Sequence, residues 1–126
     1  MKTYRDQYGR DVEEFDDLQG HHHRLVSFRN AADQLVEART ELRQDGVRLE
    51  VSRTLSGGLR EAWVHEEAFN DPSAQLTYLS LRRLEADGEG RPDLSRFTEL
   101  RSEPITGDEF FARRAELLED GSGLKL

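Results

Sequence analysis

The chain contains no cysteine. It therefore has no disulfide bonds, no thiolate ligands for zinc and no cysteine nucleophile. It also lacks any apolar run near the ~20 residues that a helix needs to cross a bilayer. The first residues, MKTYRDQYGRD, have none of the apolar character of a signal peptide. We therefore expect a cytoplasmic protein that does not insert into membranes.

Basic side chains are fewer than acidic ones in this sequence. The 126 residues include 18 basic and 26 acidic side chains, which gives a formal net charge of −8. Binding to anionic membranes, or to nucleic acid without sequence preference, requires a positively charged surface, so both are disfavoured. The length suits one domain, and we expect residues 1–126 to form a single α+β domain.

Common catalytic motifs are absent from the sequence as well. We find no G-x-S-x-G, H-E-x-x-H or G-x-G-x-x-G pattern. The segment SGG at 56–58 joins two predicted strands, as in a hairpin turn, and lacks the Gly-Lys-Ser/Thr ending of a phosphate loop. These absences predict a non-catalytic protein without a cofactor.

The first third of the chain is predicted to be mostly helical. Residues 1–23 are interpreted as an N-terminal arm or edge strand, a short acidic helix and a loop. A long amphipathic helix is predicted over 24–44, because apolar residues recur there at helical spacing and Gly46 supplies a stop. These apolar residues are Leu25, Phe28, Ala32, Leu35 and Leu42.

The middle of the chain has the alternating pattern of strands. Residues 47–55 (VRLEVSRTL) alternate apolar and polar side chains, and 59–67 (LREAWVHEE) follow after the SGG turn. Residues 74–86 are interpreted as a third strand, with a helix capped by Asp71 as the competing interpretation. A fourth strand is predicted at 95–103.

A second helix is predicted over 106–119. Thr106 and Glu109 have the spacing of a capping box, and Ile105 and Phe110 that of a hydrophobic staple. We expect the buried stripe to contain Phe111 together with Ala115 and Leu118, Gly121 to end the helix, and residues 121–126 to fray.

Together these elements predict an antiparallel sheet of three to four strands, formed by residues 47–102 and covered on one face by the N-terminal long helix and the C-terminal helix. The third strand carries apolar side chains on both faces, which indicates a second covered face. The simplest way to cover it is a homodimer. At the level of the fold alone, this order of helix, strands and helix resembles secretion chaperones, toxin-immunity proteins and phage inhibitors.

The main functional hypothesis is a non-catalytic protein-interaction module: an acidic adaptor, chaperone or inhibitor that binds a protein partner, expected to be basic. Acidic side chains crowd one segment, and amphipathic aromatic residues are favoured at interfaces. Mimicry of a nucleic-acid backbone by these acids is a special case of this hypothesis. The candidate partner-binding residues are Asp11, Glu13, Glu14, Asp16, Asp17, Trp63 and Tyr78.

The alternative hypothesis is a small metal-binding protein or enzyme that uses His21 and His23 with His65. Nothing in the spacing requires a metal, so a solvated loop remains the main interpretation of the three consecutive histidines at 21–23.

A last feature is a set of arginines on neighbouring predicted strands. Their charges are expected to be neutralised largely by cross-strand pairing with glutamates. The arginines are Arg48, Arg53, Arg60, Arg82 and Arg83, and the glutamates are Glu50, Glu61 and Glu85.

Overall fold

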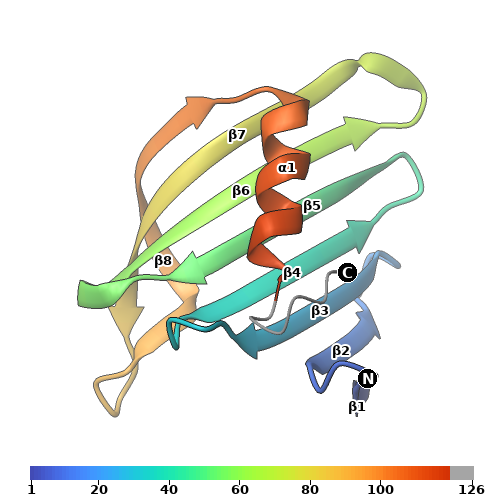
Figure 1. The fold of residues 1–126 in the computed structure, drawn as a ribbon. Coiled ribbons are helices and arrows are strands. Elements are labelled where there is room, and N and C mark those ends of the chain that lie inside the picture. Colours follow the sequence, from blue (N-terminus) through green and yellow to red (C-terminus); the bar gives the residue numbers. More distant parts are fainter. Residues whose placement is uncertain (120–126) are drawn as a thin grey trace.

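The computed structural model describes residues 1–119, which form one eight-stranded antiparallel sheet and one α-helix (Figure 1). Each strand pairs with its neighbours in sequence, so the sheet order is β1 to β8 without a crossover. The strands are β1 (Lys2–Arg5), β2 (Asp11–Asp16), β3 (His22–Arg29), β4 (Leu35–Leu42), β5 (Gly46–Thr54), β6 (Leu59–Ala68), β7 (Asp71–Ala86) and β8 (Pro92–Pro104). A short 3₁₀ turn, Ser56–Gly58, joins β5 to β6, and α1 spans Gly107–Leu117.

The core lies between α1 and one face of the sheet. One row of side chains crosses six strands on this face, because each member pairs with the next in the strand register. The row is Val12, Val26, Ala38, Val51, Trp63 and Leu79. Helix α1 packs against this row and adds to the core the fully buried side chain of Phe110 together with that of Leu117. Leu118, at the end of the helix, is buried in the same core. The helix therefore covers the middle of the sheet.

The predicted helix over 24–44 is wrong, because these residues form β3, β4 and the turn between them. The side-chain oxygen of Asn30 accepts hydrogen bonds from the backbone amides of Ala32 and Gln34, at 3.1 and 2.9 Å. Asp33 takes a left-handed conformation, with φ of 58°. An Asx turn of this kind reverses the chain where the helix was predicted to continue.

The short acidic helix predicted after residue 10 is also wrong. Residues 11–16 form β2, and Val12 pairs with Val26 in the core. Residues 1–23 thus contribute β1, β2 and the start of β3 to the sheet, and β1 is one of its two edge strands. Residues 1–119 form mainly a β-sheet with one α-helix, so the predicted α+β class, with two helices on a small sheet, is wrong. The helix–strands–helix order, on which the resemblance to chaperones and immunity proteins depended, is absent from residues 1–119.

The four strands predicted after residue 46 are present as β5 to β8. Residues 74–86 form part of β7, so the strand interpretation is confirmed over the helical one. Thr106 caps α1 as predicted, because its hydroxyl accepts a hydrogen bond from the backbone amide of Glu109 at 3.1 Å. The buried aromatic ring is Phe110 and not Phe111, whose side chain is 49% exposed. The predicted helix end at Gly121 and the frayed tail at 121–126 lie outside the described residues.

Candidate functional site

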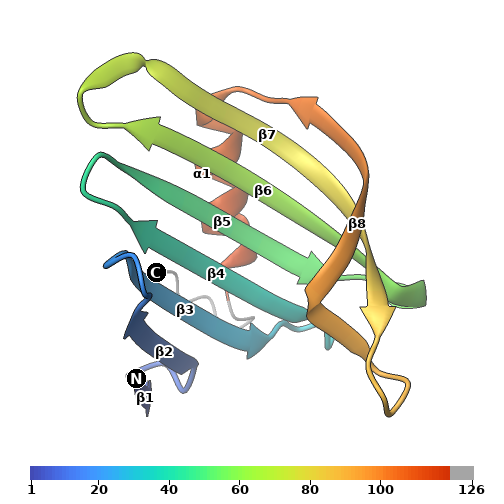
Figure 2. The ribbon, with the colours of Figure 1, turned by 180° about the vertical axis from the view of Figure 1, so that it is seen from behind.

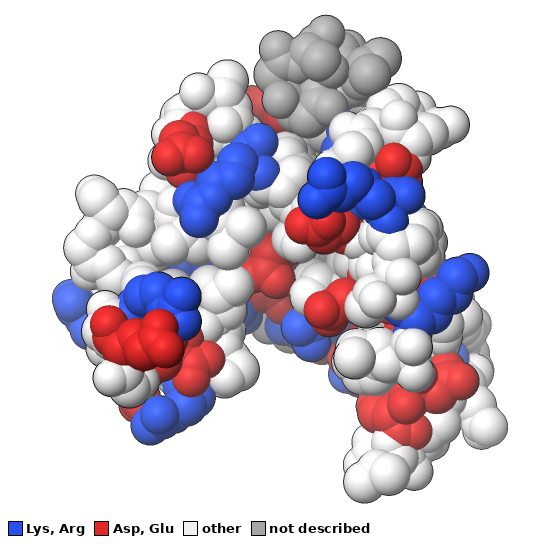
Figure 3. Space-filling view, turned by 90° about the horizontal axis from the view of Figure 1, so that it is seen from below, with Lys and Arg blue, Asp and Glu red and all other residues white. Residues whose placement is uncertain are grey.

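The face of the sheet away from α1 carries a polar hollow. In Figure 2, β8 crosses in front of the other strands on this face, and Figure 3 shows charged side chains at the bottom of the hollow. The hollow has a volume of about 470 Å³. It is lined by Leu25, Glu37, Arg39, Glu41, Arg48, Glu50, Ser52, Arg60, Arg82, Leu94, Ser95 and Phe97. No helix of residues 1–119 covers it (Figure 2).

Strand alternation places these charges on one face. Val36 and Ala38 of β4 point into the core, so Glu37, Arg39 and Glu41 point into the hollow. On β5, Val51 is buried in the core while its neighbours Glu50 and Ser52 line the hollow. The sequence therefore encodes an apolar face and a charged face through the same strands.

Two ion-pair systems order most of the charges in the hollow. In the first, Arg60 Nη2 lies 2.7 Å from Glu37 Oε1, and Arg60 Nε donates a 2.9 Å hydrogen bond to Ser52 Oγ. In the second, Glu50 pairs with both Arg82 and Arg48, the latter at 2.7 Å. Arg48 also contacts Glu66 at 2.9 Å. The side chains of Arg60, Glu37 and Arg82 are each less than a tenth exposed, so the pairs are shielded from water.

Glu50 is held ionised by its neighbours. Burial alone would raise the pKa of this carboxyl group, but the guanidinium groups of Arg82 and Arg48 outweigh burial and hold the pKa below its ordinary value of 4.5. A carboxyl group whose pKa is lowered by folding stabilises the folded state above its ordinary pKa. That stabilisation disappears as the pH falls through the lowered pKa.

We therefore expect Glu50→Gln to change the acid dependence of stability. At pH 7 the variant should have a lower free energy of unfolding than the wild type, because Arg82 and Arg48 lose their carboxylate. The two curves should begin to approach each other below about pH 4.5, and they should meet once the pH has fallen through the lowered pKa and Glu50 of the folded wild type is protonated. Urea denaturation between pH 7 and 3 measures both effects. Glu13→Gln is the control, since Glu13 is exposed and outside any ion pair of residues 1–119; a constant difference between Glu50→Gln and wild type would contradict the assignment.

Arg39 differs from the other arginines of the hollow. It is exposed, and within residues 1–119 its guanidinium is in no ion pair. Its cross-strand neighbours are Leu25 on β3 and Glu50 on β5. Because Glu50 is already engaged by Arg82 and Arg48, Arg39 presents an uncompensated positive charge to the hollow.

Strand β8 provides an apolar wall beside these charges. Phe97 is 43% exposed and its ring lies over the Arg82 guanidinium, 4.3 Å from the ring centroid. Leu94 lines the same wall. Glu99 accepts a hydrogen bond of 3.0 Å from the buried Ser80 hydroxyl, which holds β8 against β7. A group that enters the hollow therefore meets apolar surface on one side and guanidinium groups on the other.

The predicted acidic segment does not form one surface. Strand β2 alternates, so Glu14 and Asp16 lie on the α1 side while Asp11 and Glu13 lie on the opposite side. Most of these acids already have cationic or histidine neighbours: Asp11 contacts Arg5 at 3.4 Å, and Asp16 contacts His22 at 2.9 Å. Partner binding by this segment remains a prediction.

The two aromatic candidates lie on opposite faces of the sheet. Trp63 is buried in the core, where the Arg113 guanidinium lies 4.7 Å from its ring centroid. Tyr78 is half-buried on the side of the hollow, paired with Val64 of β6. Only Tyr78 is therefore placed near the hollow.

The three candidate metal-binding histidines are not brought together. His65 is buried against α1, with its ring 5.5 Å from Phe110 and its Nδ1 2.8 Å from the Thr77 hydroxyl. His21 and His23 lie on the other side, beside Asp17. A hydrogen bond with the His23 ring, together with the backbone amide of His21, lowers the pKa of Asp17 to about 2. The sequence hypothesis found this histidine pair but missed the carboxylate of Glu41, which lies 3.3 Å from His21.

The predicted cross-strand pairing of arginines with these glutamates is confirmed for Arg53 with Glu61 at 2.8 Å and for Arg82 with Glu50. Arg48 instead contacts Glu50 along its own strand, β5. What sequence reasoning missed was Glu37, Arg39 and Glu41, because residues 24–44 were interpreted as a helix. Their alternation with Val36 and Ala38 was the available signal.

No helix among residues 1–119 has the length and apolar character needed to span a membrane. Comparison with known proteins finds no family model that matches the chain, and no curated protein or solved structure that is significantly similar to it.

Proposed function

We propose that this protein is a non-catalytic binding protein and that its binding surface is the polar hollow opposite α1. The observation that carries the proposal is Arg39, an exposed guanidinium on the floor of an uncovered hollow. The neighbouring charges are held by ion pairs, so Arg39 is the charge left for a partner. Arginine is among the residues that most often dominate the energy of protein interfaces.

The partner that fits this surface is a protein segment that carries a carboxylate beside an apolar side chain. The residues lining the hollow include four arginines and three glutamates, an excess of positive charge in a chain whose net charge is −8. Leu94 and Phe97 offer apolar contact at the rim. This differs from the partner expected from composition alone, because the sign of the charge in the hollow is opposite to that of the whole chain.

Capture experiments with two arginine variants test the proposal. Arg83 is a matched control, because it is an exposed arginine outside any ion pair of residues 1–119, on the face that α1 covers. The wild type, Arg39→Glu and Arg83→Glu are immobilised, and proteins captured from a lysate of the source organism are compared by quantitative mass spectrometry. A specific partner should be lost on Arg39→Glu and retained on Arg83→Glu.

Titration with the purified partner then measures the effect. We expect Arg39→Glu to weaken binding by at least ~30-fold, as for a residue that contributes ~2 kcal/mol to an interface. Affinity should also fall as salt concentration rises. A partner that binds both variants equally, or that is lost equally on both, would show that the hollow is not the binding surface.

A further inference from the structure

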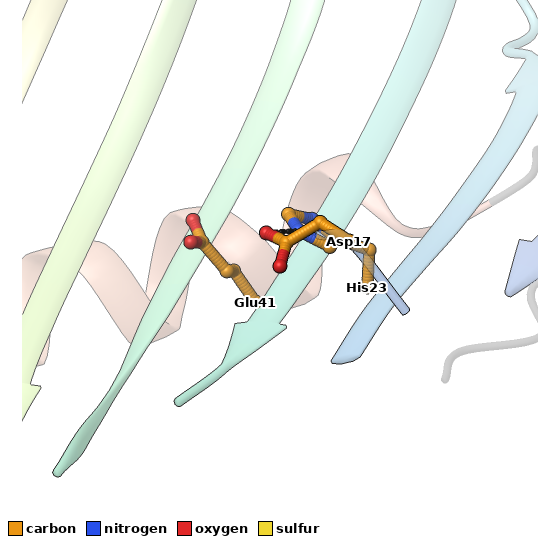
Figure 4. A group of neighbouring side chains, drawn as sticks. All are labelled: Asp17, His23 and Glu41. Carbon is orange, nitrogen blue, oxygen red and sulfur yellow. Dashed lines mark hydrogen bonds and ion pairs between the residues drawn. The ribbon is translucent and has the colours of Figure 1, made fainter. Parts of the chain in front are cut away.

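Four potential metal ligands converge at one end of the hollow. Asp17 comes from the turn after β2, His21 from the end of the same turn, His23 from β3 and Glu41 from β4. One ligand atom each from Asp17, His23 and Glu41 lie within 4.8 Å of one another (Figure 4). His21 Nδ1 lies 3.5 Å from Asp17 Oδ2 and 3.3 Å from Glu41 Oε1. Two imidazoles and two carboxylates thus share a small volume.

The Asp17 carboxylate is fixed in position by its turn. Its Oδ1 accepts hydrogen bonds from the backbone amides of Gln19 and His21, at 2.9 and 3.0 Å. This leaves Oδ2 directed at the histidines, 2.9 Å from His23 Nε2. Hydrogen bonds that orient a ligand in this way are the usual support of a metal site.

The His23 ring is also held rigidly. It is 9% exposed and stacks on Phe15, with the ring centroids 4.7 Å apart and the planes 7° from parallel. Its cross-strand neighbour is Glu41. Its second ring nitrogen, Nδ1, is buried and has no hydrogen-bond partner among residues 1–119. The ring is thus hydrogen-bonded to Asp17 at Nε2, while Nδ1 is a buried nitrogen without a partner among the described residues.

We propose that Asp17, His21, His23 and Glu41 form a binding site for one divalent transition-metal ion. Imidazole nitrogens combined with carboxylate oxygens suit Zn²⁺, Ni²⁺ or Co²⁺, whereas Mg²⁺ and Ca²⁺ take mainly oxygen ligands. The two carboxylates balance the charge of the ion. This site is independent of the proposed partner, although Glu41 also lines the hollow.

Zn²⁺ is the probe for the first test. Tag-free protein, stripped of metal with a chelator, is titrated with ZnCl₂ at pH 7.5 by calorimetry, and with MgCl₂ as a comparison. We expect one Zn²⁺ per chain, no measurable Mg²⁺ binding, and a higher melting temperature with Zn²⁺, because an ion that binds only the folded state stabilises it. Binding of several zinc ions of equal weakness, or no binding, would overturn the proposal.

Three variants locate the ion. Asp17→Asn keeps the oxygen that accepts the two backbone hydrogen bonds but replaces the ligating oxygen, so the turn should survive. It and His23→Gln should each weaken Zn²⁺ binding at least ~10-fold. His22→Gln is the matched control, because His22 faces the other side of the sheet and contacts Asp16. Circular dichroism without metal checks that each variant folds; equal losses in Asp17→Asn and His22→Gln would point to chelation by the histidine run alone.

A variant of Arg43 is expected to strengthen Zn²⁺ binding, whereas the variants of the ligands weaken it. Arg43 Nε lies 3.1 Å from Glu41 Oε1 and competes with an ion for that oxygen. Arg43→Gln should therefore strengthen Zn²⁺ binding, and weaker binding would contradict the role of Glu41. Arg39→Glu leaves all four ligands in place and should retain the ion, so failure of the zinc site and failure of the partner surface give different results.

Discussion

Replacement of Phe110 by alanine is expected to reduce the free energy of unfolding by about 3–5 kcal/mol, the usual cost of deleting a fully buried aromatic ring. The Phe110 side chain is completely buried between α1 and the sheet. It stacks on the buried His65 ring and meets Phe111 edge to face at 5.1 Å. Because α1 is the only helix of the described residues that covers the core, the cavity would lie at the centre of the one helix–sheet interface.

Phe111→Ala is the matched control for this prediction. The side chain of Phe111 is 49% exposed, so its removal should cost only about 1 kcal/mol, as is typical of a partly exposed position. Urea denaturation followed by the fluorescence of Trp63, the single tryptophan, measures both variants. Equal losses at the two positions would mean that α1 does not present Phe110 to the core.

The second large effect is expected at Arg60. Replacing it by leucine leaves the Glu37 carboxylate buried without its guanidinium partner, which lies at 2.7 Å in the wild type. Removing one member of a buried pair costs about 3–5 kcal/mol, because the remaining charge is poorly solvated. The floor of the hollow is open on one side, so we expect a value near the lower end, about 3 kcal/mol.

The double variant Arg60→Leu/Glu37→Leu separates this charge effect from a loss of packing. Two apolar side chains leave no buried charge, and most of the lost stability should return. The free energies of unfolding of the wild type, both single variants and the double variant complete a thermodynamic cycle. If the double variant were as unstable as the sum of the two single ones, Arg60 and Glu37 would not be acting as a pair.

The strands of the second half could be predicted because their alternation is clean. In β5, Val47, Leu49 and Val51 alternate with polar residues, and the SGG turn limits the strand. The cap of α1 could also be predicted, because the hydrogen bond between Thr106 and Glu109 joins residues close in sequence. Which of two adjacent phenylalanines is buried depends on how the helix is rotated against the sheet, and that is a tertiary property.

The first half was misread because its turns were not recognised. Four hairpin turns have the same design, in which the side-chain oxygen of an Asp or Asn accepts hydrogen bonds from the amides two and four residues later. These turns span residues 6–10 (DQYGR), 17–21 (DLQGH), 30–34 (NAADQ) and 87–91 (DGEGR). The third position after the Asp or Asn has positive φ in each, for example Gly20 at 80° and Asp33 at 58°. Recognising that recurrence would have divided residues 24–44 into two strands.

The wrong helix prediction over 24–44 also concealed residues of both candidate sites. His21 and His23 were identified as a pair, but their carboxylate neighbour Glu41 lies across the β3–β4 hairpin, where it pairs with His23. A helix over 24–44 hides that pairing. For the same reason Arg39 was not identified as a candidate. That it lacks an ion-pair partner among residues 1–119 can be understood only when Glu50 is known to pair with Arg82 and Arg48. Long-range register, and not composition, decides both sites.

The uninterrupted order of the strands has a consequence for how the chain folds. Each strand can pair with the one made just before it, so the sheet can grow hairpin by hairpin during synthesis, with short loops to close at every step. Only α1 must return over a long stretch of sequence, to dock on β5, β6 and β7. Until it does, the valine-rich row across the sheet has no cover. The growing chain thus carries an exposed apolar surface until residue 117 has left the ribosome, which makes this interval the one in which a chaperone is most needed.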